Sequence, residues 1–294
     1  MKKLHFFTCL ILLMHQQLTA QEPVAPRKDQ MLEKHGHQRN DPYYWMRERD
    51  TQPVLDYLHA ENALNKAALE IVSYAQRLGG NVTVLATGSL SNDILRKLLK
   101  KNITTTFNAI TCDGDTSTND MATIFATGKV DNAQIKNIND KKIQNFDKAL
   151  NKVLLNLAKR VVSDGEGSSK FVTVNVKKCK SEIEAKQIAL SIANSPLVKT
   201  AIAGEDPNWG RIIMAIGKAG PKINLKKLLI KFGNLKIVQD GKLHQGYDET
   251  KASEYMKNEN IDIDIEIFTG KKSFTVYTMD FTKKYIDINA DYRS

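Results

Sequence analysis

The sequence is poor in cysteine, proline and aromatic residues. Three of its 294 residues are cysteine, seven are proline and 7% are aromatic. Cys9 lies in an N-terminal apolar run, and Cys112 and Cys179 stand apart with no Cys-x-x-Cys spacing. This distribution argues against a disulfide-rich scaffold and a structural zinc site. No apolar run after the N-terminal one is long enough to span a bilayer.

Several catalytic and cofactor motifs are also missing. The sequence has no Gly-x-Ser-x-Gly nucleophile elbow, no Rossmann Gly-x-Gly-x-x-Gly and no Walker loop. Glu33, His35 and His37 lie close together in the sequence, but a His-x-His loop without a second ligand pair is typical of solvated chain. We therefore predict no bound metal and no bound cofactor.

The chain is basic, with a formal net charge of +10. Such a charge permits nucleic acid, anionic lipid or acidic metabolites as partners. The excess lysines are scattered, however, and the one tight cluster, "RKLLKK" at 96–101, is typical of a solvated helix face. We predict no nucleic acid partner.

The first 20 residues have the pattern of a secretory signal peptide. Lys2 and Lys3 precede an apolar stretch over 4–14, and the small Ala20 lies at the expected cleavage position. The alternative is a buried first helix. The pattern favours a signal peptide over 1–20 and therefore export.

Residues 21–65 differ in composition from the rest of the chain. The stretch "HGHQRNDPYYWMRERDTQPVLDYLHAENA" resembles the opening segment of the prolyl oligopeptidase family, oligopeptidase B in particular. Because no nucleophile elbow follows it, we expect no peptidase chemistry in this chain. Residues 66–89 then form a junction segment, in which "KAALEIVSYAQRLGGNVTVLATG" predicts an amphipathic helix, a Gly-Gly break and a strand.

Residues 90–294 alternate helical and strand patterns, which predicts a layered α+β fold with mixed sheets. Ser91 is a suitable N-cap for one helix, and "SEIE" at 181–184 is a capping box that opens another. Apolar residues recur at helical spacing over 146–161, while "KFVTVNVK" alternates as a strand. The patterns over 225–238, 260–268 and 272–281 predict strands, the last two joined as a hairpin across 269–272.

Four motifs in this part carry a family resemblance: "TFNAITCDGDTSTNDM", "VVSDGEGSSKFVTV", "IANSPLVKTAIAGEDPNWGRIIMAIGKAG" and "YIDINADYRS". Together they resemble the ornithine acetyltransferase family, also called glutamate N-acetyltransferase, over residues 90–294. The resemblance implies the β-chain part of that family's α+β fold, preceded by an unrelated N-terminal extension. A fused or misassembled reading frame is the simplest explanation of that combination.

The resemblance also implies an activity. Members of the family cleave themselves before a Thr, which becomes the nucleophile of the β chain and moves an acetyl group from N-acetylornithine to glutamate in arginine biosynthesis. A free α-amino group on the same residue can act as the base for such a hydroxyl. Acetyl-CoA serves some members as a co-substrate, and the resemblance implies an α2β2-like heterotetramer in the cytoplasm, which conflicts with the export signal.

The family's nucleophile segment is not found in this sequence. Its place is taken by "YAQRLGGNVTVLATG" at 74–88, where Thr87 is the nearest hydroxyl but lacks the preceding Lys-Gly and Met-Ala context. Thr123, in Met-Ala-Thr, lies after "DGDTSTND", which we expect to be a loop that caps a following helix. The catalytic residue is therefore unknown, and activity of this chain alone is not expected.

Three positions match the family's substrate-binding residues. Glu166, in "DGEG", suits an amino group through a charge-assisted contact. Asn289 offers an amide that donates and accepts, and Ser294 keeps the hydroxyl of a terminal Thr. The plain alternatives are a Glu-Gly turn at a helix end and a fraying terminus. For the whole chain, the alternative to an acetyltransferase is a secreted, noncatalytic module that binds an amino acid.

Overall fold

The computed structural model describes residues 27–34, 37–40, 52, 72–78, 81–86, 88–117, 120–128, 134–135 and 137–291. The predicted signal peptide, Thr87 and Ser294 lie outside these residues. The chain divides into two compact units, one of residues 1–99 and 121–150 and the other of residues 100–120 and 151–294. In the described part, no helix is both long and apolar enough to cross a membrane.

The first unit holds two small sheets. One is the antiparallel pair β1 (Met31–Lys34) and β2 (His37–Asn40), and the other has three strands in the order β3-β4-β5: β3 (Val72–Leu78), β4 (Asn81–Ala86) and β5 (Ala122–Ala126). β4 runs antiparallel to β3 and parallel to β5. In β4, Val82 and Val84 are buried.

Two predictions for this unit are wrong. The helix expected before Gly-Gly is strand β3 over the described residues 72–78, because Val72 and residues 74–78 pair with β4 and Leu78 lies opposite Asn81. Only Gly-Gly separates these paired ends in the sequence, as in a two-residue hairpin. The helix expected after "DGDTSTND" is strand β5, where Thr123 pairs with Thr83. A short apolar segment can form a helix or a strand, and pairing with a neighbouring strand favours the strand.

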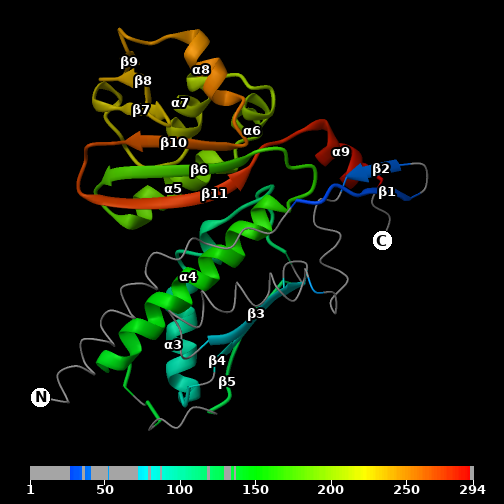
Figure 1. The fold of residues 1–294 in the computed structure, drawn as a ribbon. Coiled ribbons are helices and arrows are strands. Elements are labelled where there is room, and N and C mark those ends of the chain that lie inside the picture. Colours follow the sequence, from blue (N-terminus) through cyan, green and yellow to red (C-terminus); the bar gives the residue numbers. More distant parts are fainter. Residues whose placement is uncertain are drawn as a thin grey trace, which may run out of the picture. The chain divides into compact units, whose positions relative to one another are not determined.

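Two helices confirm their sequence patterns (Figure 1): α3 (Asn92–Ile103) and α4 (Lys141–Ser163). At the start of α3, the Ile94 amide lies 3.4 Å from Ser91 Oγ, as expected for an N-cap. The short 3-10 helix η2 (Phe107–Ala109) follows α3. In α4, Phe146, Leu150 and Leu154 are buried along one stripe.

The second unit is built on a six-stranded mixed sheet in the order β11-β6-β10-β7-β8-β9. Its strands are β6 (Phe171–Cys179), β7 (Leu229–Phe232), β8 (Leu235–Gln239), β9 (Lys242–Leu243), β10 (Asn260–Glu266) and β11 (Lys272–Met279). β6 and β10 are parallel, and the remaining neighbours are antiparallel. The mixed α/β architecture confirms the predicted fold class.

Short helices accompany this sheet: α5 (Glu182–Ala193), α6 (Pro196–Ala203), α7 (Trp209–Gly217), η3 (Leu225–Lys227), α8 (Glu249–Met256) and α9 (Lys283–Ala290). α5 packs against β6 and β11. The capping box is confirmed, since Ser181 Oγ accepts from the Glu184 amide at 3.1 Å. The Glu184 carboxylate reaches the Lys180 amide, one residue before the cap.

The predicted hairpin between the last two strands is wrong. β6 lies between β10 and β11 in the sheet, as Figure 1 shows. The connecting loop crosses the end of β6, where the amides of Thr269 and Gly270 donate to the Lys178 carbonyl at 2.8 and 3.0 Å. A Cβ on Gly270 would lie 2.4 Å from the Cys179 carbonyl oxygen, so this crossing requires glycine.

Candidate functional site

Glu166 lies in the turn between α4 and β6. The turn continues the last turn of α4, with the Asp164 amide donating to the Arg160 carbonyl at 3.0 Å. Gly167 has φ +70°, a conformation that L side chains rarely adopt, and a Cβ there would lie 2.5 Å from the Tyr285 nitrogen. The glycine next to Glu166 therefore allows this turn to contact the start of α9.

Asn289 lies near the end of α9 and reaches Glu166 directly. Its Nδ2 donates to Glu166 Oε2 at 2.8 Å and to the Tyr285 carbonyl at 3.0 Å. Because both partners are acceptors, the amide orientation is determined and Nδ2 faces them. Both side chains belong to exposed residues. Two predicted substrate-binding residues, 123 positions apart, thus form one contact.

The "CDGD" segment contacts the same helix. Tyr285 Oη donates to Asp113 Oδ2 at 3.0 Å, while Asp113 Oδ1 accepts from the Asp115 amide at 2.9 Å. Burial, followed by the hydrogen bond to the Asp113 carboxylate, raises the pKa of Tyr285 to about 12. The Tyr285 phenol therefore remains a donor at neutral pH. Its hydrogen bond links the motif that contains Asp113 to α9.

Two further titratable groups lie near this contact. Burial raises the pKa of the Cys112 thiol to about 11, so the thiol is protonated at neutral pH and poorly nucleophilic. Burial lowers the pKa of Lys199 to about 8, against the opposing influence of Cys112 and Asp280. Lys199 Nζ donates to Thr278 Oγ1 at 2.8 Å and to the Met279 carbonyl, and it lies 4.5 Å from the centre of the Phe281 ring.

The remaining predicted residues are not part of this contact. Thr87 and Ser294 lie outside the described residues, and Thr123 is in β5 of the other unit. The "DPNWGRI" motif opens α7, where Asn208 Oδ1 accepts from the Arg211 amide at 3.2 Å and Trp209 packs against the core. Sequence reasoning missed Tyr285, although it lies four residues before Asn289 and so on the same helix face.

The contact leaves acceptor atoms for a ligand. With Nδ2 engaged, Asn289 Oδ1 remains an acceptor, and Glu166 Oε1 receives no hydrogen bond from the described residues. A carboxylate oxygen and an amide oxygen are suitable acceptors for an ammonium group, which has three donors and no acceptor. The arrangement can bind and orient an amine. It supplies no activated nucleophile of its own.

Two protein-family models match parts of the chain. The family model described as ArgJ family matches residues 82–294. The chain belongs to the ArgJ family. Residues 23–86 also match the family model of the prolyl oligopeptidase N-terminal beta-propeller domain, in agreement with the resemblance noted for the N-terminal segment.

Several curated relatives of this ArgJ family member are bacterial proteins named arginine biosynthesis bifunctional protein ArgJ. The protein of Brucella melitensis is 47% identical over 214 residues, which cover 72% of this chain and 52% of the relative. The protein of Mesorhizobium japonicum is 46% identical over 237 residues, which cover 79% of this chain and 57% of the relative. The chain thus spans about half the length of the curated relatives it matches.

A solved structure has the same fold. It is the arginine biosynthesis bifunctional protein of Bacillus halodurans, with a TM-score of 0.68 and 35% sequence identity, covering 72% of this chain and 98% of that chain. The solved structure and the family model match similar shares of this ArgJ family member. The mixed fold is therefore a property of the family.

Proposed function

We propose that this chain is the amino-acid-binding half of a glutamate N-acetyltransferase, which transfers an acetyl group from N-acetylornithine to glutamate in arginine biosynthesis. The proposal is supported by the ArgJ family membership of residues 82–294 and by the names of the relatives. Because the chain spans about half of those relatives, the rest of the reaction is assigned to segments outside the matched part.

The hydrogen bond from Asn289 to Glu166 carries the proposal. It fixes the Glu166 carboxylate and the Asn289 amide against each other before any ligand binds. The α-ammonium groups of ornithine and of glutamate both suit this pair of acceptors. Ser294 is proposed as a third contact. A charge-assisted hydrogen bond of this kind contributes about 1.5–3 kcal/mol.

The nucleophile is proposed to be a Thr supplied with the other half of the enzyme. Thr123 pairs within a strand, and the raised pKa of Cys112 makes that thiol a poor substitute. We further propose an α2β2-like assembly in the cytoplasm, with acetyl-CoA as a second possible acetyl donor.

Reconstitution tests this proposal. The full chain is mixed with the part of the Brucella melitensis relative that the match leaves uncovered, and association is checked by size-exclusion chromatography. Mass spectrometry then follows the formation of N-acetylglutamate from N-acetylornithine and isotope-labelled glutamate. We expect product from the mixture, at least about ten-fold less with Glu166→Gln, and an unchanged yield with Glu254→Gln. Glu254 is a matched control because it is an exposed carboxylate on α8.

Three results separate the alternatives. Product from this chain alone, with an acetyl group on the chain in intact-mass spectra, would show that it has its own nucleophile. Substrate binding without transfer in an associated mixture would favour the noncatalytic module. An associated mixture that forms product equally well with Glu166→Gln would contradict the role of Glu166.

A further inference from the structure

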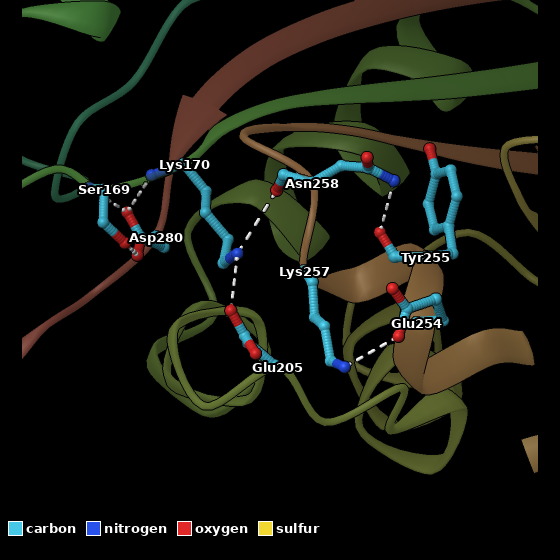
Figure 2. Close-up of polar contacts among 8 residues, drawn as sticks. All are labelled: Ser169, Lys170, Glu205, Glu254, Tyr255, Lys257, Asn258 and Asp280. Atoms are coloured by element: carbon cyan, nitrogen blue, oxygen red, sulfur yellow. Dashed lines mark hydrogen bonds and ion pairs between the residues drawn. The ribbon is translucent and has the colours of Figure 1, made fainter. Parts of the chain in front are cut away.

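The Asp280 carboxylate is buried directly after β11, with an exposed fraction of 0%. Its Oδ1 accepts from the amides of Ser169 and Lys170 at 2.8 and 3.0 Å, and its Oδ2 accepts from Ser169 Oγ. Figure 2 shows these contacts between the end of β11 and the start of β6. Three donors thus stabilise a buried carboxylate, and they all belong to the segment that follows Glu166.

The Lys170 side chain, like its backbone amide, makes hydrogen bonds to other segments of the chain. Its Nζ donates to Glu205 Oε1 at 3.1 Å and to the Asn258 carbonyl at 3.2 Å, and 8% of the side chain is exposed (Figure 2). These partners precede α7 and β10 respectively. Hydrogen bonds therefore anchor Ser169 and Lys170 at the C-terminal end of the turn that carries Glu166.

Lys199 holds the chain on either side of Asp280. Its Nζ donates to the Met279 carbonyl, and its own carbonyl accepts from the Phe281 amide at 3.2 Å. These contacts limit the movement of Asp280 relative to α6. The carboxylate is consequently presented in one position to the segment after Glu166.

A row of contacts joins the segment that begins at Asp280 to the turn that carries Glu166. Thr282 Oγ1 donates to the Gly167 carbonyl at 2.7 Å, and Gly167 lies against the Tyr285 backbone. The last contact is the hydrogen bond from Asn289 to Glu166. The two segments are antiparallel: residues 170 to 166 of the turn contact, in this order, residues 280 to 289. The buried end of this row of contacts is at Asp280, and the exposed end is at Glu166 and Asn289.

We propose that Asp280 is a positioning residue that sets the spacing of Glu166 and Asn289. Its carboxylate anchors the buried end of this row of contacts, so a shift there displaces Glu166 from α9 at the exposed end. The functional meaning of the spacing rests on the proposed amine-binding role of Glu166. The spacing itself is measurable without any substrate.

Nuclear magnetic resonance of the full chain tests the proposal through the side-chain amide of Asn289, assigned by its loss in Asn289→Asp. Because Asn289 Nδ2 lies 2.8 Å from Glu166 Oε2, we expect a nuclear Overhauser effect between these amide protons and the Glu166 side chain in the native protein, and we expect Glu166→Ala to abolish it. We expect Asp280→Ala to abolish it too, at temperatures well below its melting point. Asp280→Asn should retain it, because an amide Oδ1 still accepts both backbone donors.

Thr282→Val provides a second variant that removes no buried charge. We expect it to reduce this Overhauser effect to an intensity between those of the native protein and Asp280→Ala. An unchanged effect in Asp280→Ala overturns the proposal, as does an unchanged effect in Thr282→Val if the alanine variant does not fold. Loss of the effect in Asp280→Ala, together with a native chain that binds no amine when titrated with glutamate, supports the positioning role but refutes the proposed function.

Discussion

The six-stranded sheet and the Glu166 site belong to the same unit but are stabilised in opposite ways. The sheet buries apolar side chains on its central strands, including Val174, Ile263 and Phe232. The site consists of exposed and half-buried polar side chains joined by hydrogen bonds between distant segments. Burial of apolar area contributes most of the folding free energy, whereas exposed polar contacts contribute little.

This difference teaches that stability and binding can be changed separately in this unit. A core substitution lowers the free energy of unfolding and leaves the geometry of the remaining folded molecules intact. A substitution in the Glu166 turn changes binding and lowers stability less than a core substitution does. Three substitutions test this separation, beginning with the largest expected effect.

Phe232→Ala should lower the free energy of unfolding by about 3–5 kcal/mol, because it leaves a cavity in the centre of the sheet. Phe232 is 1% exposed. Urea unfolding followed by circular dichroism measures the effect. Leu197→Ala is the matched control, since Leu197 is 52% exposed on α6 and should change stability by about 0.5 kcal/mol at most. Equal effects of the two substitutions would contradict the assigned core.

Lys199→Met should change how stability depends on pH. The lowered pKa of about 8 in the folded protein means that both states are protonated below pH 8, where the burial cost is fully present. Between about pH 8 and 10.5 the unfolded chain retains the proton longer. Native stability should therefore rise with pH relative to Lys199→Met, by about 3 kcal/mol across this window.

Urea unfolding of both proteins at several pH values measures this difference. Subtracting the two curves removes contributions common to both proteins. A difference that stays constant from pH 7 to pH 10.5 would contradict the burial of a titrating Lys199.

Gly167→Ala should lower stability by about 1–3 kcal/mol, because φ is +70° and the added Cβ would meet the Tyr285 backbone. The separation of Glu166 from Asn289 should also increase. Gly217→Ala is the matched control, since a Cβ added there would meet nothing within 4 Å and alanine favours the helix. Thermal unfolding compares the two; a less stable Gly217→Ala would show that alanine itself is the cause.

The sequence predicts local structure correctly where a pattern is compatible with one type of secondary structure only. Ser91 and the apolar spacing after it predict α3, the alternation over 171–177 predicts β6, and Ser181 with Glu184 predicts the start of α5. These signals are carried by neighbours within one element. They need no knowledge of the rest of the chain.

The remaining features depend on partners far away in the sequence. Nothing in the strand patterns indicates that β6 inserts between β10 and β11, and strand β3 is decided by its pairing with β4. Glu166 and Asn289 were identified by family resemblance, and their contact is a result of the fold. Asp280 has no local signal at all, because its donors lie about 110 residues earlier.

The central claim is that the Glu166 carboxylate, oriented by Asn289, binds the ammonium group of an amino-acid substrate. Isothermal titration of the full chain with glutamate tests it most directly, in the native protein, Glu166→Gln and Glu254→Gln. We predict that Glu166→Gln weakens binding by about 10- to 100-fold, as expected for a lost charge-assisted hydrogen bond, and that Glu254→Gln has no effect. Equal affinities of the two variants would contradict the claim.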